Sequence, residues 1–135
     1  MKCVVLDTNV LVSALWCKDS KPAQIVQQLL SQELTLCYDY RIMGEYMDVL
    51  HRDKFMFIPS EIEDIMNAVE LSGISVVIDQ NTFVAADDAV FADEDDRMFY
   101  EVAKFCNATL ITGNKRHYPD KSFIMTPAEF LARCE

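Results

Sequence analysis

The chain has 135 residues, enough for one domain, and its 51% hydrophobic and 25% charged residues are typical of a globular protein. Its net charge of −10 disfavours nucleic-acid binding through a generally basic surface. No stretch reaches the roughly 18 apolar residues that span a bilayer, and Asp7 interrupts the N-terminal apolar run. We therefore expect a single cytoplasmic domain over residues 1–135, with no membrane association. The five cysteines include no CxxC pair, which favours reduced packing residues over zinc ligands.

Short apolar runs alternate with segments of helical periodicity along the chain. The expected strands are apolar on both faces, as in a parallel sheet that is covered on both sides: 3–6, 35–38, 74–78, 108–112 and 122–125. The expected helices show apolar residues at spacings of three and four: 9–16, 20–32, 40–50, 60–72, 96–106 and one that begins at Pro127. Ser20 and Asp39 stand at expected N-caps. The alternation predicts an α/β fold with helices on both faces of one sheet.

One segment does not fit this alternation. Residues 79–95, DQNTFVAADDAVFADED, are long for a connection between a strand and a helix, and long loops are often functional. We expect a loop beside the site, with a short helix around 82–86, rather than a strand of the sheet.

Acidic and amide side chains recur where expected strands end or expected helices begin. Asp7 ends the first strand, Asn114 follows the fourth, and Glu45 lies in the helix after the second. Asp95 and Asp96 open the helix 96–106. Ligands of parallel sheets bind beyond the carboxyl ends of the strands, so these side chains are expected at one edge. Carboxylates gathered there would repel one another unless a cation joined them, and their oxygens suit Mg²⁺ or Mn²⁺ better than zinc.

Each of these residues also has an ordinary structural interpretation. Asp7 can cap the helix 9–16, and Asp95 or Asp96 can cap the helix that they open. Glu45 can be a solvated helix residue, and Asp48, one turn later, competes for its role. Asn114 after Gly113 can belong to an ordinary turn. The joint placement of these residues favours a site over four separate structural roles.

Four stretches carry a family resemblance in the family's order along the chain: VVLDTNVLVSAL at 4–15, MGEYMDVL at 43–50, DEDDRMFYEVA at 93–103 and LITGNKRH at 110–117. The sequence resembles the PIN-domain ribonucleases, in particular the branch described as toxins of toxin–antitoxin pairs. The seven-residue spacing from Asp96 to Ala103 matches the family pattern. The resemblance implies a three-layer α/β/α sandwich with a mostly parallel sheet of about five short strands. It also implies an Mg²⁺- or Mn²⁺-dependent endoribonuclease that hydrolyses RNA phosphodiester bonds.

The resemblance also assigns roles to residues. The catalytic positions would be Asp7, Glu45, Asp96 and Asn114, and the metal ligands would be Asp7, Glu45, Asp96 and the adjacent Asp95. Hydrogen bonds from the side chains that flank them would orient these ligands: Thr8, Asn9 and Thr112. Apart from the resemblance, the basic run that immediately follows the site is placed to hold RNA phosphates, with a solvated turn as the alternative: Lys115, Arg116 and His117. Asn114 stands where the family often has Asp, so this site would carry one negative charge fewer.

The resemblance further implies an RNA substrate, a cognate antitoxin protein as partner and the possibility of a homodimer. Two other functions remain open on the sequence. One is a catalytically weak module that binds RNA or a protein through the same fold. The other is a phosphatase of the haloacid-dehalogenase type, whose D-x-D signature resembles LDTN, although Asn9 replaces its second acid.

Overall fold

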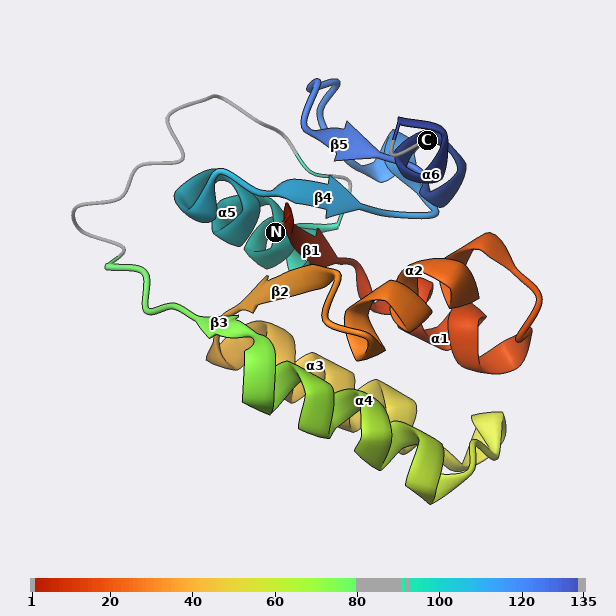
Figure 1. Ribbon diagram of the computed structural model, residues 1–135. Coiled ribbons are helices and arrows are strands. Elements are labelled where there is room, and N and C mark those ends of the chain that lie inside the picture. The colour runs from red at the N-terminus through yellow and green to blue at the C-terminus, as the bar shows by residue number, and fades with distance from the viewer. Residues whose placement is uncertain (1, 80–90, 92, 134–135) are drawn as a thin grey trace.

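The computed structural model describes residues 2–79, 91 and 93–133 (Figure 1). Its sheet has five parallel strands in the order β3-β2-β1-β4-β5. The first strand of the chain is central, and Val4 pairs with Leu36 on one side and with Thr109 on the other. The strands are β1 (Lys2–Leu6), β2 (Leu34–Tyr38), β3 (Ile74–Ser75), β4 (Thr109–Ile111) and β5 (Ile124–Met125).

Helices cover both faces of this sheet. Val4, Val5 and Leu6 are all completely buried, and successive residues of a strand point to opposite faces. The α-helices are α1 (Thr8–Trp16), α2 (Lys21–Leu30), α3 (Tyr40–Leu50), α4 (Pro59–Ser72), α5 (Arg97–Cys106) and α6 (Pro127–Arg133). Three short 3₁₀ helices complete the described elements: η1 (Asp53–Phe55), η2 (Glu94–Asp96) and η3 (Lys115–His117). The expected three-layer α/β/α fold is confirmed.

Local sequence signals explain where the helices begin and end. Ser20 Oγ accepts a hydrogen bond from the Ala23 amide at 3.2 Å, and Asp39 Oδ1 accepts from the amides of Arg41 and Ile42, so both expected N-caps form. The fourth helix ends at Gly73 as expected. A Cβ at this position would lie 2.3 Å from the Val69 carbonyl oxygen, so the close packing of the chain requires glycine there.

The structure shortens the expected strand 74–78. Only Ile74–Ser75 pairs with β2, and the Val76 amide adds one bond to the Tyr38 carbonyl oxygen at 2.9 Å. Ile74 and Ser75 are exposed, and Val77 is 86% exposed. The apolar run was expected to lie between two layers of helices, but it lies at an edge with one neighbouring strand and soon leaves the sheet.

The segment 79–95 is described only in part. Residues 80–90 and 92, including the expected short helix around 82–86, lie outside the described residues. Phe91 is buried, with its ring edge-on to Tyr100 at a centroid distance of 5.3 Å. Phe91 is therefore anchored on α5. No helix among the described residues is both long and apolar enough to cross a membrane.

Candidate active site at the carboxyl edge of the sheet

The candidate site lies where the strand order reverses direction. Strands β2 and β3 extend to one side of β1, and β4 and β5 extend to the other (Figure 1). The Asp7 amide donates to the Ile111 carbonyl oxygen at 3.0 Å, so the carboxyl ends of β1 and β4 are joined. Such a reversal opens a crevice beyond the strand ends, which is the usual ligand site of a parallel sheet.

Asp7 is held in this position by hydrogen bonds from three directions. It is 5% exposed, and its Oδ2 accepts from Thr112 Oγ1 at 2.9 Å and from the Tyr118 hydroxyl at 3.0 Å. Its Oδ1 accepts from the Asn9 amide at 3.3 Å, so Asp7 also caps α1. The two interpretations of Asp7 are therefore compatible: the residue begins a helix and presents a carboxylate at the sheet edge.

Glu45 is directed toward Asp7 by two contacts of α3. The buried hydroxyl of Tyr46 donates to the Leu6 carbonyl oxygen and fixes α3 against β1. Thr8 Oγ1 donates to Glu45 Oε2, which brings this carboxylate next to the start of α1. Burial raises the pKa of Glu45, the Thr8 hydrogen bond opposes this, and the charges of Asp7 and Asp95 raise the pKa further.

Asp48, the competing acid one turn later, has a different environment. Its side chain is 69% exposed and pairs with Arg52 at 2.9 Å. Among the acids of α3, the structure therefore places Glu45 rather than Asp48 beside Asp7.

Asp96 belongs to the same electrostatic cluster. Burial, together with the negative charges of Asp7, Asp93 and Glu45, raises its pKa to about 6, against the partial opposition of His117. His117 Nδ1 lies 3.8 Å from Asp96 Oδ2. The described structure gives Asp96 no capping hydrogen bond, and the cap of η2 is Asp93, whose Oδ1 accepts from the Asp95 amide at 2.9 Å. The structure thus does not support the interpretation of Asp96 as a helix cap.

The remaining expected residues lie around this cluster in different ways. The Asn114 amide donates to Thr112 Oγ1 at 3.0 Å, and its side chain is exposed. Of the basic run, His117 faces Asp96, Arg116 is exposed, and Lys115 Nζ lies 3.1 Å from Glu129 Oε1 on α6. Asp95 is exposed and lines a pocket of about 310 Å³ beside Glu45. The three basic residues are consecutive in the sequence and were expected to act together. In the structure, however, Lys115 points toward Glu129 on α6 and not toward the carboxylate cluster.

Tyr118 contributes to the site although no sequence signal singled it out. It is 7% exposed, burial and the charge of Asp7 raise the pKa of its hydroxyl, and the hydroxyl therefore stays a proton donor to Asp7 Oδ2. The aromatic ring packs edge-on to Phe91 at a centroid distance of 6.1 Å. A tyrosine in a polar turn could not be assigned to the site before its partner Asp7 was placed in space.

If Asp7 binds a divalent cation, we expect Tyr118→Phe to weaken that binding by roughly 10-fold, because the substitution removes a hydrogen bond that orients Asp7. Unfolding stability should fall by only about 1 kcal/mol, since Asp7 keeps its bond from Thr112. Isothermal titration with Mn²⁺ and thermal denaturation measure the two effects. Unchanged Mn²⁺ affinity would show that Tyr118 is only a packing residue.

The donor set of this cluster fits a hard divalent cation. Its available oxygens belong to carboxylates, and the pKa values of Glu45 and Asp96 are raised in part by mutual repulsion, which a cation would relieve. In the part of the chain that the structure describes, no group of three or more His, Cys, Asp or Glu residues is close enough to enclose an ion. The preference for Mg²⁺ over zinc rests on ligand type alone, because carboxylate oxygens are hard ligands.

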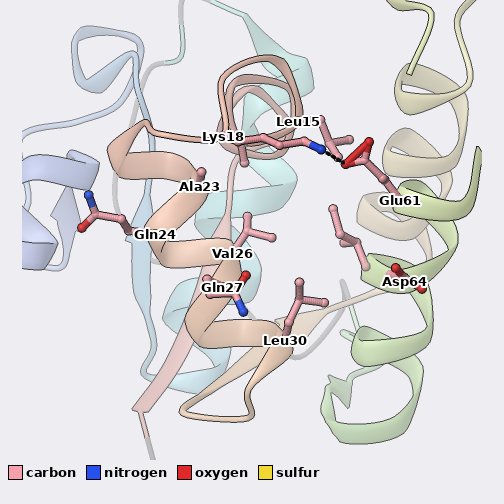
Figure 2. Close-up of a pocket in the computed structure, with 11 residues that line it drawn as sticks. Leu15, Lys18, Ala23, Gln24, Val26, Gln27, Leu30, Glu61 and Asp64 are labelled. Carbon is pink, nitrogen blue, oxygen red and sulfur yellow. Dashed lines mark ion pairs between the residues drawn. The ribbon is translucent and has the colours of Figure 1, made fainter. Parts of the chain in front are cut away.

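Pocket size alone does not locate this cluster. A larger pocket, of about 420 Å³, lies between α2 and α4, with Leu15, Val26 and Leu30 at its apolar wall (Figure 2). The ion pair between Lys18 and Glu61, at 3.0 Å, bridges one end of it. None of the clustered carboxylates lines this pocket, so the electrostatic cluster and the strand ends define the candidate active site.

Comparisons with known proteins agree with this architecture. A family model described as a PIN domain matches residues 3–116. A protein named "Uncharacterized protein MJ1680" from Methanocaldococcus jannaschii is 30% identical over 113 residues, which cover 83% of this chain and 70% of that protein. A chain in the crystal structure of VapBC2 from Rickettsia felis bound to a DNA fragment from their promoter has a TM-score of 0.52 at 14% identity. That match covers 92% of this chain and 96% of the other.

The fold and the matched residues define the class of protein as a PIN domain, and this chain belongs to the PIN-domain family. The family consists in general of nucleases that use divalent metals. All four stretches that carried the sequence resemblance begin within the matched range, and only His117 lies outside it.

Proposed function

We propose that this protein is an Mg²⁺- or Mn²⁺-dependent endoribonuclease, with Asp7, Glu45 and Asp96 as its central acidic residues. The observation that carries the proposal is the shared electrostatic environment of these three side chains, which come from distant parts of the sequence. A divalent ion bound there would neutralise charge on a phosphate and make a water molecule a better nucleophile. The hydrogen bonds of Asp7 and Glu45 hold both carboxylates in place before substrate binds.

The residues around the cluster support a role in positioning RNA. His117 faces Asp96 at the site, and its neighbour Arg116 is exposed on the same short helix, so both are available for phosphate groups. Asn114 presents an exposed amide side chain at the position where related proteins often have an aspartate, so the site carries one negative charge fewer. We assign Thr8 and Thr112 to the orientation of Glu45 and Asp7, because each donates a hydrogen bond to one of these carboxylates.

We further propose that the protein is the toxin of a toxin–antitoxin pair. The resemblance of its motifs to that branch of the family supports this assignment, and the fold is shared with a chain of the VapBC2 structure. A cognate antitoxin protein is then the expected partner, and the RNA target would be set by surfaces outside the carboxylate cluster.

The test is cleavage of a single-stranded RNA by the purified protein in the presence of Mg²⁺ or Mn²⁺. We expect internal cuts that EDTA abolishes and that added Mn²⁺ restores. The same preparation should not hydrolyse p-nitrophenyl phosphate, which a haloacid-dehalogenase-type phosphatase would attack. RNA binding without cleavage at millimolar Mn²⁺ would instead indicate the catalytically weak binding module.

A further inference from the structure

An aromatic cluster lies at the end of α1, away from the carboxylates. The ring of Trp16 packs edge-on to Phe55 at a centroid distance of 5.6 Å and to Phe57 at 6.2 Å. Phe55 and Phe57 are stacked on each other at 5.1 Å with an angle of 5° between their planes. We call these three residues the aromatic platform. The two phenylalanines come from the segment between α3 and α4, yellow in Figure 1.

The platform is exposed at Trp16, whereas Phe55 and Phe57 are half-buried and Phe57 packs against the core. Trp16 is 66% exposed, and the neighbouring Met56 and Ile58 are 86% and 55% exposed. Met56 also has a left-handed backbone conformation, with φ of 52°, which is uncommon for a residue other than glycine. A group of large apolar side chains left in water at one place is characteristic of a binding surface.

Cationic side chains accompany these rings. They belong to the sequence HRDK at 51–54, which the proposed catalytic role does not use. Lys54 Nζ lies 5.0 Å from the centre of the Phe55 ring. His51 and Arg52 line a pocket of about 390 Å³ together with Phe57, and Arg52 pairs at 2.9 Å with Asp48. Rings for base stacking and cations for the adjoining phosphates are the chemistry that recognises single-stranded nucleic acid. An apolar protein segment would use the rings but not the cations.

Two helices connect the platform to the candidate active site. The first, α1, begins at Thr8 beside Asp7 and ends eight residues later at Trp16, so it spans roughly 12 Å at about 1.5 Å per residue. The second, α3, carries Glu45 and ends at Leu50, just before the basic run. An extended strand whose phosphate lay at the carboxylates could therefore reach the platform within a few nucleotides.

We propose that the aromatic platform binds unpaired bases of the RNA strand, a few nucleotides away from the phosphate at the carboxylate cluster. This inference rests on the proposed ribonuclease function and adds a binding site to it. Stacking contributes affinity that depends little on sequence and tolerates the acidic charge of the remaining surface. The platform would thus select single-stranded over double-stranded RNA, because paired bases cannot stack on protein rings.

Trp16 is the only tryptophan of the chain, so its fluorescence reports on this site directly. The experiment titrates the full-length Asp96→Asn variant, which should bind without cutting, with a single-stranded oligoribonucleotide. We expect saturable quenching with the single strand and little change with a duplex of equal length. Absence of quenching by an RNA that is bound, as shown by anisotropy of a label on the RNA, would overturn the proposal.

Substitutions then test the affinity that the platform contributes. Trp16→Ala and Phe55→Ala should each weaken binding of the labelled single strand by about 10-fold, within the range seen for removal of one stacking ring. Lys54→Gln changes no ring and should lower the salt dependence of binding. The control is Phe105→Ala on α5, which removes a ring of 44% exposure far along the chain from the platform and should bind normally. Circular dichroism melting verifies that each variant is folded.

The outcomes separate the two proposals. If wild-type protein cuts RNA and Trp16→Ala binds and cuts it equally well, the platform proposal is wrong and the ribonuclease proposal stands. Self-association in sedimentation that Trp16→Ala abolishes, with RNA affinity unchanged, would also overturn the platform proposal and assign these rings to a protein interface. Quenching of Trp16 in a protein that never cuts RNA would leave the platform as a binding site and refute the nuclease mechanism.

Discussion

Asp96→Asn is expected to lower RNA cleavage by roughly 10²–10³-fold or more, the loss typical when one group that stabilises transition-state charge is removed. Asparagine keeps the size of the side chain but removes a negative charge from a cluster that also contains Asp7 and Glu45. The effect cannot arise from a lost helix cap, because in the described structure Asp96 makes no capping hydrogen bond. Gel analysis of a labelled RNA in Mn²⁺ measures the rate.

The same substitution should stabilise the metal-free protein above pH 6. The pKa of Asp96 is raised from 3.8 to about 6 in the folded state, so the folded protein loses stability as pH rises through this interval. The shift sets an upper limit of roughly 3 kcal/mol at 1.36 kcal/mol per pKa unit, and we expect about 1–2 kcal/mol because the side chain is 18% exposed. Urea denaturation in EDTA should show the gain at pH 8 and a smaller one at pH 5.

Two further variants complete this experiment: a control that removes a charge elsewhere and a converse variant that adds a charge near the cluster. Asp64→Asn removes the same charge from an exposed position on α4 and should leave cleavage unchanged. Asn114→Asp adds a charge near the cluster and should strengthen Mn²⁺ binding while lowering the stability of the metal-free protein. An Asp96→Asn protein that cuts RNA at the wild-type rate in Mn²⁺ would refute the proposed mechanism.

Arg41→Met is expected to have the largest effect on stability. Its guanidinium links two helices: Nε donates to Asp39 Oδ2 at 2.8 Å, and Nη1 donates to Glu101 Oε1 on α5 at 2.8 Å. Nη2 also lies 2.8 Å from Asp39 Oδ2, but this contact is not aligned as a hydrogen bond. Asp39 and Glu101 are 2% and 8% exposed, so the substitution leaves two buried carboxylates without their cation. Buried ion pairs broken in this way cost about 3–5 kcal/mol.

We expect a loss of about 2–4 kcal/mol for Arg41→Met, less than for a fully buried pair, because 27% of the arginine side chain is exposed. Urea denaturation gives the free energy of unfolding. The double variant Arg41→Met with Glu101→Leu should regain part of this loss, since it removes one of the stranded carboxylates. A stability change for Arg41→Met of less than about 0.5 kcal/mol, the size usual for surface substitutions, would show that the network is not structurally important.

The sequence was sufficient to predict the order of the elements and the parallel sheet, because buried parallel strands and amphipathic helices have strong local patterns. It was also sufficient to place Asp7 and Glu45 near the carboxyl ends of strands. The short β3 was not predictable, because an apolar run looks the same whether it lies at the centre or at the edge of a sheet. Tyr118 and the Arg41 network were missed because their partners are 111 and 60 residues away in the chain, and only tertiary packing brings them together.

The bond from the Tyr46 hydroxyl to the Leu6 carbonyl oxygen has a consequence for regulation. It ties the residue after Glu45 to the residue before Asp7, inside a fully buried part of the core. The backbone segments that carry the two carboxylates are therefore held together for as long as α3 stays packed on β1, and contacts in a buried core are among the last to open. If the proposed function holds, an inhibiting partner is expected to cover the carboxylates or the RNA-binding surface rather than to pull α3 away from β1.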